Sequence, residues 1–173
     1  DSGSAAITDT FKITVSNTND APTVVNAISD QAAIEDSALS FQYASNVFTD
    51  VDAGDSFTYT ATLSDGSALP SWLSFDAGSR TFSGTPLNGD VGAIDVKVTA
   101  TDSGSAAITD TFKITVSNTA DAPTGISFSS NSVAENSMGA VVGDIIVEDD
   151  DNDVTFYTLA SGGDNEYFEF YRS

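Results

Sequence analysis

The chain has 173 residues, of which 26 are acidic and 5 basic, so its formal net charge at pH 7 is −21. This charge makes nucleic acid and anionic lipid poor partners and makes a cation the partner to expect. Because the chain contains no cysteine and no histidine, disulfides, thiolate chemistry, the usual zinc sites and histidine-based triads are excluded.

One stretch of the sequence occurs twice. DSGSAAITDTFKITVSNTND at residues 1–20 recurs at residues 102–121 with a single change, Asn19 to Ala120. The offset of 101 residues is the length of a small sandwich domain rather than of a helical repeat. We therefore expect a slice of a tandem array: the last strand and linker of a preceding repeat at 1–20, one complete domain at 21–121, and the N-terminal part of a following repeat at 122–173.

The first predicted element is a strand over Ile7 to Ser16. Phe11, Ile13 and Val15 alternate with polar residues, and this period of two is typical of a half-buried strand. The stretch from Asn17 to Pro22 ends it, because Pro lacks a backbone donor and Asn and Asp favour turns.

The complete domain continues the same pattern. Turn signals such as Asp65-Gly66 separate its alternating runs. Trp72, Leu73 and Phe75 are expected in the core. Roughly seven strands in about 100 residues, without a helical period, predict an all-β protein of tandem Greek-key β-sandwich domains of immunoglobulin-like type. The clearest predicted strands lie at 39–43, 57–63, 94–100 and 112–116.

Carboxylates gather where the predicted strands end. Like charges in small loops repel one another unless they share a hard cation, and Ca²⁺ takes about 6 to 8 oxygen ligands. We therefore predict a calcium site at each domain junction. The acidic residues at strand ends and junctions are Asp20, Glu35, Asp50, Asp52, Asp55, Asp90, Asp102 and Asp121.

The third unit keeps acidic residues at corresponding places. Glu135-Asn136-Ser137 matches Glu35-Asp36-Ser37, and Asp149-Asp150-Asp151 stands where Asp50-Val51-Asp52 stands. Because the two units otherwise differ in sequence, this matched placement favours a shared role over random solvated turns.

These motifs resemble those of cadherin repeats. The junctions at 17–22 and 118–123 look like the cadherin interdomain linker, residues 50–52 and 149–151 like its DxD motif, and residues 99–104 like its AxDxG motif. The middle domain, with Pro70 to Asp76 and Phe82 to Pro86, is similar to the dystroglycan-type cadherin-like domains of large bacterial surface adhesins.

The resemblance implies an extracellular array that calcium stiffens at each junction. Asp90 would stand in for the family's missing DRE motif, and Glu135 would be the first-strand glutamate of the third unit. Ala120 replaces the ligand that Asn19 offers, so the second junction is expected to hold fewer or weaker ions. The implied ligands are Asn19, Asp20, Asp50, Asp52 and Asp102 at the first junction, and Glu35, Asp121, Asp149 and Asp151 at the second.

Together with the acidic loops, this resemblance implies a calcium-binding spacer of a secreted or cell-surface adhesin that supports cell adhesion. Its expected partners are neighbouring repeats, and carbohydrate or another cell surface, with no nucleic acid and no membrane insertion. The alternatives are solvated acidic turns and a calcium-dependent carbohydrate-binding module that uses Trp72 as a stacking platform. Catalysis is the least supported class, because the paired carboxylates lie in repeated loops and no histidine or cysteine could serve as base or nucleophile.

Overall fold

A computed structural model describes residues 3–4, 6–132, 134, 140 and 143–151, and the chain divides into two compact units, Asp1–Ser117 and Asn118–Ser173. The described residues form strands and one 3₁₀ turn, which confirms the predicted all-β class. None of them belongs to a helix long and apolar enough to cross a membrane.

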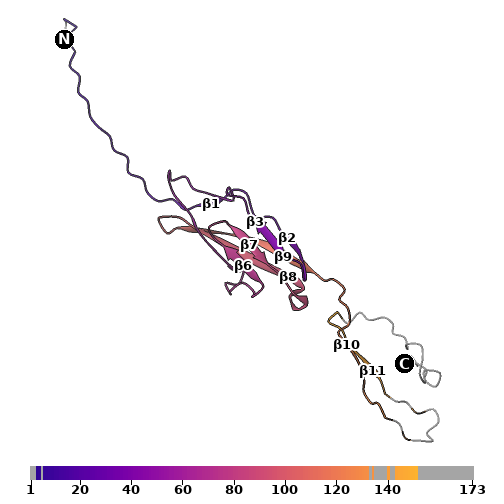
Figure 1. The fold of residues 1–173 in the computed structure, drawn as a ribbon. Coiled ribbons are helices and arrows are strands. Elements are labelled where there is room, and N and C mark those ends of the chain that lie inside the picture. Colours follow the sequence, from indigo (N-terminus) through magenta and orange to yellow (C-terminus); the bar gives the residue numbers. More distant parts are fainter. Residues whose placement is uncertain (1–2, 5, 133, 135–139, 141–142, 152–173) are drawn as a thin grey trace. The chain divides into compact units, whose positions relative to one another are not determined.

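The first unit carries nine strands in the described part of the chain (Figure 1). The 3₁₀ turn η1 is Asn88–Asp90. The strands are β1 (Thr23–Val24), β2 (Gln31–Ile34), β3 (Leu39–Gln42), β4 (Phe48–Thr49), β5 (Thr58–Leu63), β6 (Leu73–Asp76), β7 (Thr81–Gly84), β8 (Gly92–Thr101) and β9 (Ala107–Ser117).

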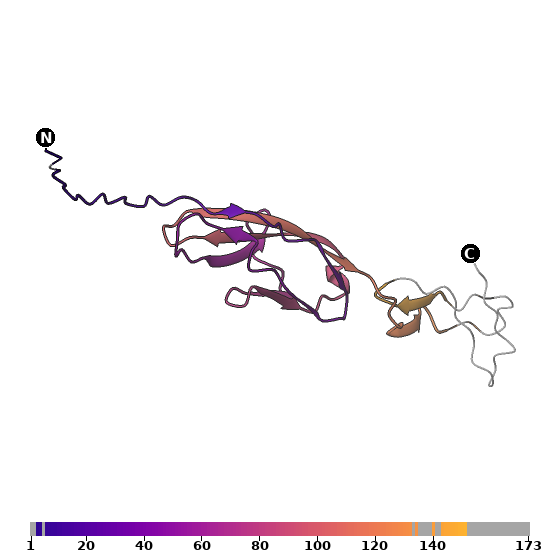
Figure 2. The ribbon, with the colours of Figure 1, turned by 90° about the horizontal axis from the view of Figure 1, so that it is seen from above.

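These strands form a sandwich of two main sheets, seen as separate layers in Figure 2. One sheet has the order β2-β9-β8-β5 and the other β3-β7-β6, while β1 and β4 form a separate pair. All neighbouring strands are antiparallel except β2 and β9, which are parallel. The long hairpin of β8 and β9 pairs Gly92 with Val116 at one end and Thr101 with Ala107 at the other.

The alternation seen in the sequence places one face of each long strand in the core. In β9, Phe112, Ile114 and Val116 are buried, and the polar residues between them are exposed. In β8, Val96, Val98 and Ala100 are fully buried in the same way. The four predicted strands are therefore confirmed, because period-two alternation matches the pleat of a half-buried sheet.

Phe82 of β7 joins the two layers. Its ring is fully buried, stacks on Phe75 and Phe41 at 4.5 and 5.1 Å, and meets the edge of Phe112 in the other sheet at 5.5 Å. Of the three residues predicted as a core plug, Leu73 is buried, while Trp72 and Phe75 are half-buried and pack against the core.

Residues 7–16, predicted as the half-buried last strand of a preceding repeat, form no strand in this structure. Phe11, Ile13 and Val15 are 79, 75 and 88% exposed, and the segment forms no ladder with any strand in the described part of the chain. A strand needs a neighbour for its backbone hydrogen bonds, so the apolar alternation alone does not create one.

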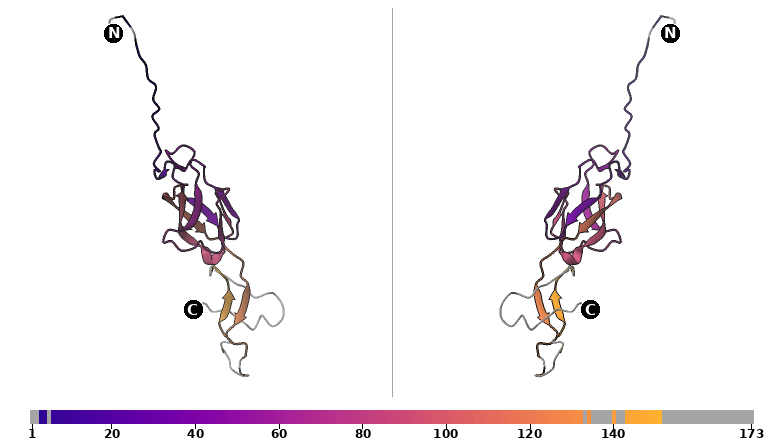
Figure 3. Two further views of the ribbon diagram at one scale, coloured as in Figure 1. Left: turned by 90° about the vertical axis from the view of Figure 1, so that its left-hand side faces the viewer. Right: turned by 90° about the vertical axis from the view of Figure 1, so that its right-hand side faces the viewer.

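The described part of the second unit contains one antiparallel pair, β10 (Gly125–Phe128) with β11 (Ile145–Glu148), shown in Figure 3. Its register joins Gly125 to Glu148 and Phe128 to Ile145. The predicted ligand Glu135 lies outside the described residues.

Candidate metal centre

Three carboxylates converge at one end of the first unit. Asp50 follows β4, Asp55 precedes β5 and Asp102 follows β8, so the ends of three strands deliver them to one place. One carboxylate oxygen of each lies within 4.8 Å of those of the other two.

Each of these carboxylates accepts a hydrogen bond through its Oδ1. Oδ1 of Asp50 accepts the Asp52 N–H at 2.8 Å, Oδ1 of Asp102 accepts the Ala106 N–H at 2.8 Å, and Oδ1 of Asp55 accepts the Ser103 hydroxyl. Oδ2 of Asp50 and Oδ2 of Asp55 are buried, and no described residue supplies a hydrogen bond to either. Buried carboxylate oxygens without donors point to a ligand that supplies positive charge.

Among the described residues, the ion pair is that of Lys113 with Asp95, at 3.0 Å. No described basic side chain therefore neutralises Asp50, Asp55 and Asp102. Two unit charges about 4.8 Å apart repel by roughly 3–4 kcal/mol at an effective dielectric constant of 20. A divalent cation with oxygen ligands would replace this repulsion with attraction. The donor set, all carboxylate oxygens, is the kind that Ca²⁺ prefers.

The segment before β1 is tied to the same loops. Asn19 donates from Nδ2 to Oδ2 of Asp102 at 3.1 Å, and the Asp20 N–H donates to Oδ2 of Asp52 at 2.8 Å. Nδ2 of Asn17 donates to Oδ1 of Asp52 at 2.7 Å. The Asp20 N–H, and after it the Asn17 amide, hold the pKa of Asp52 below its usual value. Asp52 therefore anchors the linker with both oxygens.

The structure thus places all five predicted ligands of the first junction, Asn19, Asp20, Asp50, Asp52 and Asp102, at one end of the sandwich. Sequence reasoning did not select Asp55 as a ligand, although the structure puts it in the central group. The sequence does contain a signal for Asp55, because this residue lies close behind Asp50 and Asp52 in one short loop.

Two of these hydrogen bonds recur in the second unit. The Asp121 N–H donates to Oδ2 of Asp151 at 2.5 Å, and the Asp151 N–H donates to Oδ1 of Asp149 at 3.1 Å. They repeat the contacts of Asp20 with Asp52 and of Asp52 with Asp50. The acidic residues that correspond in sequence therefore also correspond in local geometry.

Glu35 and Asp90 lie at the other end of the first unit. Glu35 follows β2, is 1% exposed, and donates its N–H to the Ser117 carbonyl at the end of β9, at 3.1 Å. Asp90 precedes β8, whereas Asp102 follows it, and Oδ2 of Asp90 accepts the Leu87 N–H at 3.0 Å in the turn η1. These two residues do not join Asp50, Asp55 and Asp102.

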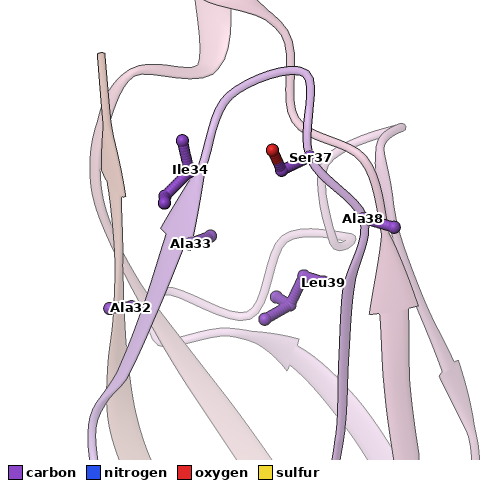
Figure 4. A pocket seen from close by; sticks show the side chains of 6 residues that line it. All are labelled: Ala32, Ala33, Ile34, Ser37, Ala38 and Leu39. Atoms are coloured by element: carbon purple, nitrogen blue, oxygen red, sulfur yellow. The ribbon is translucent and has the colours of Figure 1, made fainter. Parts of the chain in front are cut away.

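A hollow between β2 and β3 offers no comparable chemistry. Its lining contributes one polar side chain, that of Ser37, beside small or apolar ones (Figure 4). The lining residues are Ala32, Ala33, Ile34, Ser37, Ala38 and Leu39.

Comparisons with known proteins identify the fold of this unit. Residues 21–117 match the model of a family, He_PIG, described as "Putative Ig domain". The serine-rich adhesin for platelets of Staphylococcus aureus (strain USA300) is 37% identical over 109 residues, and this match covers 63% of the chain but 4% of the adhesin. The dystroglycan-type label stays a prediction.

Solved cadherin structures share the architecture. Extracellular cadherin domains 1–4 of protocadherin gamma B7 are 21% identical with a TM-score of 0.54, over 75% of this chain and 33% of that one. Domains 1–5 of protocadherin gamma B2 are 16% identical with a TM-score of 0.55, over 75% and 26% respectively. At these identities the likeness shows the β-sandwich fold alone.

Proposed function

Because the chain belongs to the Ig-like domain family whose model spans residues 21–117, we propose that it is a calcium-binding spacer module of a cell-surface adhesin. The observation that carries the proposal is the pair of buried oxygens, Oδ2 of Asp50 and Oδ2 of Asp55, that lack a hydrogen-bond donor among the described residues. The similarity to part of a staphylococcal adhesin supports the cell-surface role.

The bound ion would be held by Asp50, Asp55 and Asp102, with Asn19 and Asp20 on the linker beside them. Calcium supplies the positive charge that lets these carboxylates stay close together. Asp52 already fastens the linker to these loops through two hydrogen bonds. Locking the loops together would then stiffen the entry of the chain into the sandwich, which is what a spacer requires.

The second predicted set of ligands, Glu35, Asp121, Asp149 and Asp151, belongs to the same proposal. The repeated hydrogen bonds of Asp121 and Asp151 support it. Ala120 offers no side-chain ligand where Asn19 stands in the first set, so we expect weaker binding there. Trp72 packs partly against the core, which supports a structural role for it rather than a sugar-stacking one.

The test compares thermal unfolding with excess calcium and with a chelator. For the wild-type chain, calcium at about 100 times its dissociation constant should stabilise the fold by about 2.7 kcal/mol. The double variant Asp50→Asn/Asp55→Asn should lose this gain. Without calcium, its melting temperature should be higher than that of the wild type, because two charges that repel each other have been removed.

Asp95→Asn is the control for loss of a negative charge away from the site. Asp95 is half-exposed on β8 and pairs with Lys113, and the substitution removes one negative charge outside the carboxylate group. It should keep the full calcium response. A wild-type melting temperature that is the same with calcium and with chelator would contradict the proposal and leave the acidic loops as solvated turns.

A further inference from the structure

Residues 6–16 are a second copy of the whole of β9. Residues 1–18 are identical to residues 102–119, so each residue of this segment has a counterpart 101 positions later. In β9 the apolar residues Phe112, Ile114 and Val116 are at most 3% exposed. Their counterparts Phe11, Ile13 and Val15 are at least 75% exposed. The same apolar face is thus buried in one copy and open in the other.

The exposed copy already shares local features with β9 and with the turn that precedes it. Ser4 has φ 62° and its counterpart Ser105 has φ 74°, both in the left-handed region. Oδ1 of Asp9 accepts the Thr10 N–H at 2.8 Å, as Oδ1 of Asp110 accepts the Thr111 N–H at 3.1 Å. These features recur in both copies, so they are encoded in the local sequence.

The place of β9 is defined on both sides. β9 pairs antiparallel with β8 from Ala107 to Val116 and parallel with β2, where Gln31 lies opposite Ile114. Asp110 accepts the Ile28 N–H through Oδ2 at 2.6 Å, and the Lys113 N–H donates to Oδ1 of Asp30 at 2.8 Å. Asp9 and Lys12 carry the same groups for these two contacts.

The segment cannot take this place within its own sandwich. Ser16 would have to lie where Ser117 lies, ten residues along β9 from Ala107, which corresponds to about 34 Å. Thr23 pairs with Thr49 at the opposite end, beside Asp50. The seven residue steps from Ser16 to Thr23 span about 25 Å at most. The acceptor must therefore be a different sandwich.

We propose that residues 6–16 are a donor strand that completes the sandwich of a second copy of the chain, inserted between β2 and β8 in the place of β9. The two strands have the same sequence, so the exchanged sheet regains the contacts of the original one. The resident β9 competes as a tethered segment at an effective concentration of the order of millimolar. In the unaltered chain the exchanged form is therefore the minor one at micromolar concentration.

The first experiment disables β9 in the full chain. Phe112→Asp/Ile114→Asp puts two charges at core positions, which excludes this strand from the sandwich. The chain should then fold only by borrowing residues 6–16 from another copy. Light scattering after size-exclusion chromatography should give at least twice the monomer mass, and dilution should unfold the protein.

Two further variants isolate the donor segment. Adding Phe11→Asp/Ile13→Asp to the disabled chain leaves no competent strand, so this chain should be an unfolded monomer at every concentration. Phe11→Asp/Ile13→Asp alone should be a folded monomer. If the β9-disabled chain is a folded monomer, or if the four-fold variant still forms folded oligomers, the proposal is overturned.

The second experiment tests the strand register of the exchanged sheet in a chain that keeps both residues 6–16 and β9 intact. Lys113 lies opposite Asp95, so Lys12 of another copy should take that position. Because the chain has no cysteine, Lys12→Cys/Asp95→Cys provides the only thiols. After refolding under oxidising conditions, the disulfide-linked fraction between chains should rise with protein concentration.

Two variants serve as the positive and the negative control for this measurement. Lys113→Cys/Asp95→Cys should form the bond within one chain and shows that the geometry permits it, while Thr10→Cys/Asp95→Cys is out of register and should form little. Equal cross-linking from positions 10 and 12, or none from position 12 at any concentration, overturns the proposal. Both experiments run in chelator, so their failure leaves the calcium site untouched.

Discussion

Asn19 and Asp102, 83 positions apart in sequence, are joined by a hydrogen bond of 3.1 Å from Nδ2 to Oδ2. Gly104 makes room for this contact, because a Cβ at that position would lie 2.1 Å from Oδ1 of Asn19. The linker residue therefore rests against the loop that carries the buried carboxylate. The linker and the acidic loops behave as one assembly, and substitutions in either should affect the other.

The linker anchor at Asp52 should be sensitive to acid. Hydrogen bonds from the Asp20 N–H and the Asn17 amide lower the pKa of Asp52 from 3.8. A carboxyl group with a lowered folded pKa contributes stability that is present above its ordinary pKa and lost as the pH falls through the lowered value. Without calcium, the side-chain amide resonance of Asn17 should therefore titrate with a midpoint below 3.8, and Asp52→Asn should abolish this step. A midpoint at or above 3.8 would refute the anchor.

Gly84→Ala should destabilise the sandwich. Gly84 lies in the middle strand β7, and a Cβ there would come 1.7 Å from the backbone oxygen of Trp72. Backbone atoms can move only with the strand, so the expected loss is about 1–3 kcal/mol in urea unfolding. Gly89→Ala is the control, because a Cβ there meets nothing within 4 Å. Equal midpoints for the two variants would contradict this reading.

The sequence predicts the long strands well because period-two alternation is read directly from single residues. Leu39 and Phe41, or Val96 and Val98, report a buried face without reference to the rest of the fold. The segment over residues 7–16 shows the limit of this signal. It has the same sequence as part of β9 but forms no ladder in the described structure, because a strand depends on its neighbours.

The candidate site was predictable in part for a similar reason. Asp50 lies between two predicted strands and Asp102 follows one, and the ends of neighbouring strands gather at one end of a sandwich. Asp55 was harder to select, because it follows Gly54, whose φ of 94° lies in the left-handed region. Residue spacing does not report where such a turn directs the next side chain. Which carboxylate oxygens lack donors is likewise a property of the folded packing.

Tyr43→Phe should leave the protein equally stable or more stable. The Tyr43 hydroxyl is buried and receives no hydrogen bond from the described residues. Removing an unsatisfied hydroxyl should gain up to about 1 kcal/mol of unfolding free energy at pH 7. Urea unfolding measures this gain, and a loss of more than about 1 kcal/mol would show that the hydroxyl has a partner.

The same residue should make the fold sensitive to alkali. Burial first, and the nearby Tyr59 second, raise the pKa of Tyr43 above its ordinary value of 10.0. A raised phenol pKa gives stability that is present below pH 10 and lost as the pH rises above it, because the unfolded chain ionises first. Unfolding measured between pH 8 and pH 11 should therefore show a smaller loss for Tyr43→Phe than for the wild type. An identical loss in both would assign the alkaline sensitivity to other groups.

Asn19→Asp should make the first unit depend more strongly on calcium. The substitution removes the donor to Asp102 and adds a fourth carboxylate beside Asp50 and Asp55, so the calcium-free protein should lose about 1–3 kcal/mol. The new carboxylate is also a stronger calcium ligand than an amide oxygen, so the gain on adding calcium should exceed that of the wild type. Asn26→Asp is the matched control, since it removes an amide donor, here to the Asn46 carbonyl at 2.9 Å, and adds the same charge. It should lose stability without a larger calcium response, and an equal response from both variants would show that the added charge acts without coordinating the ion.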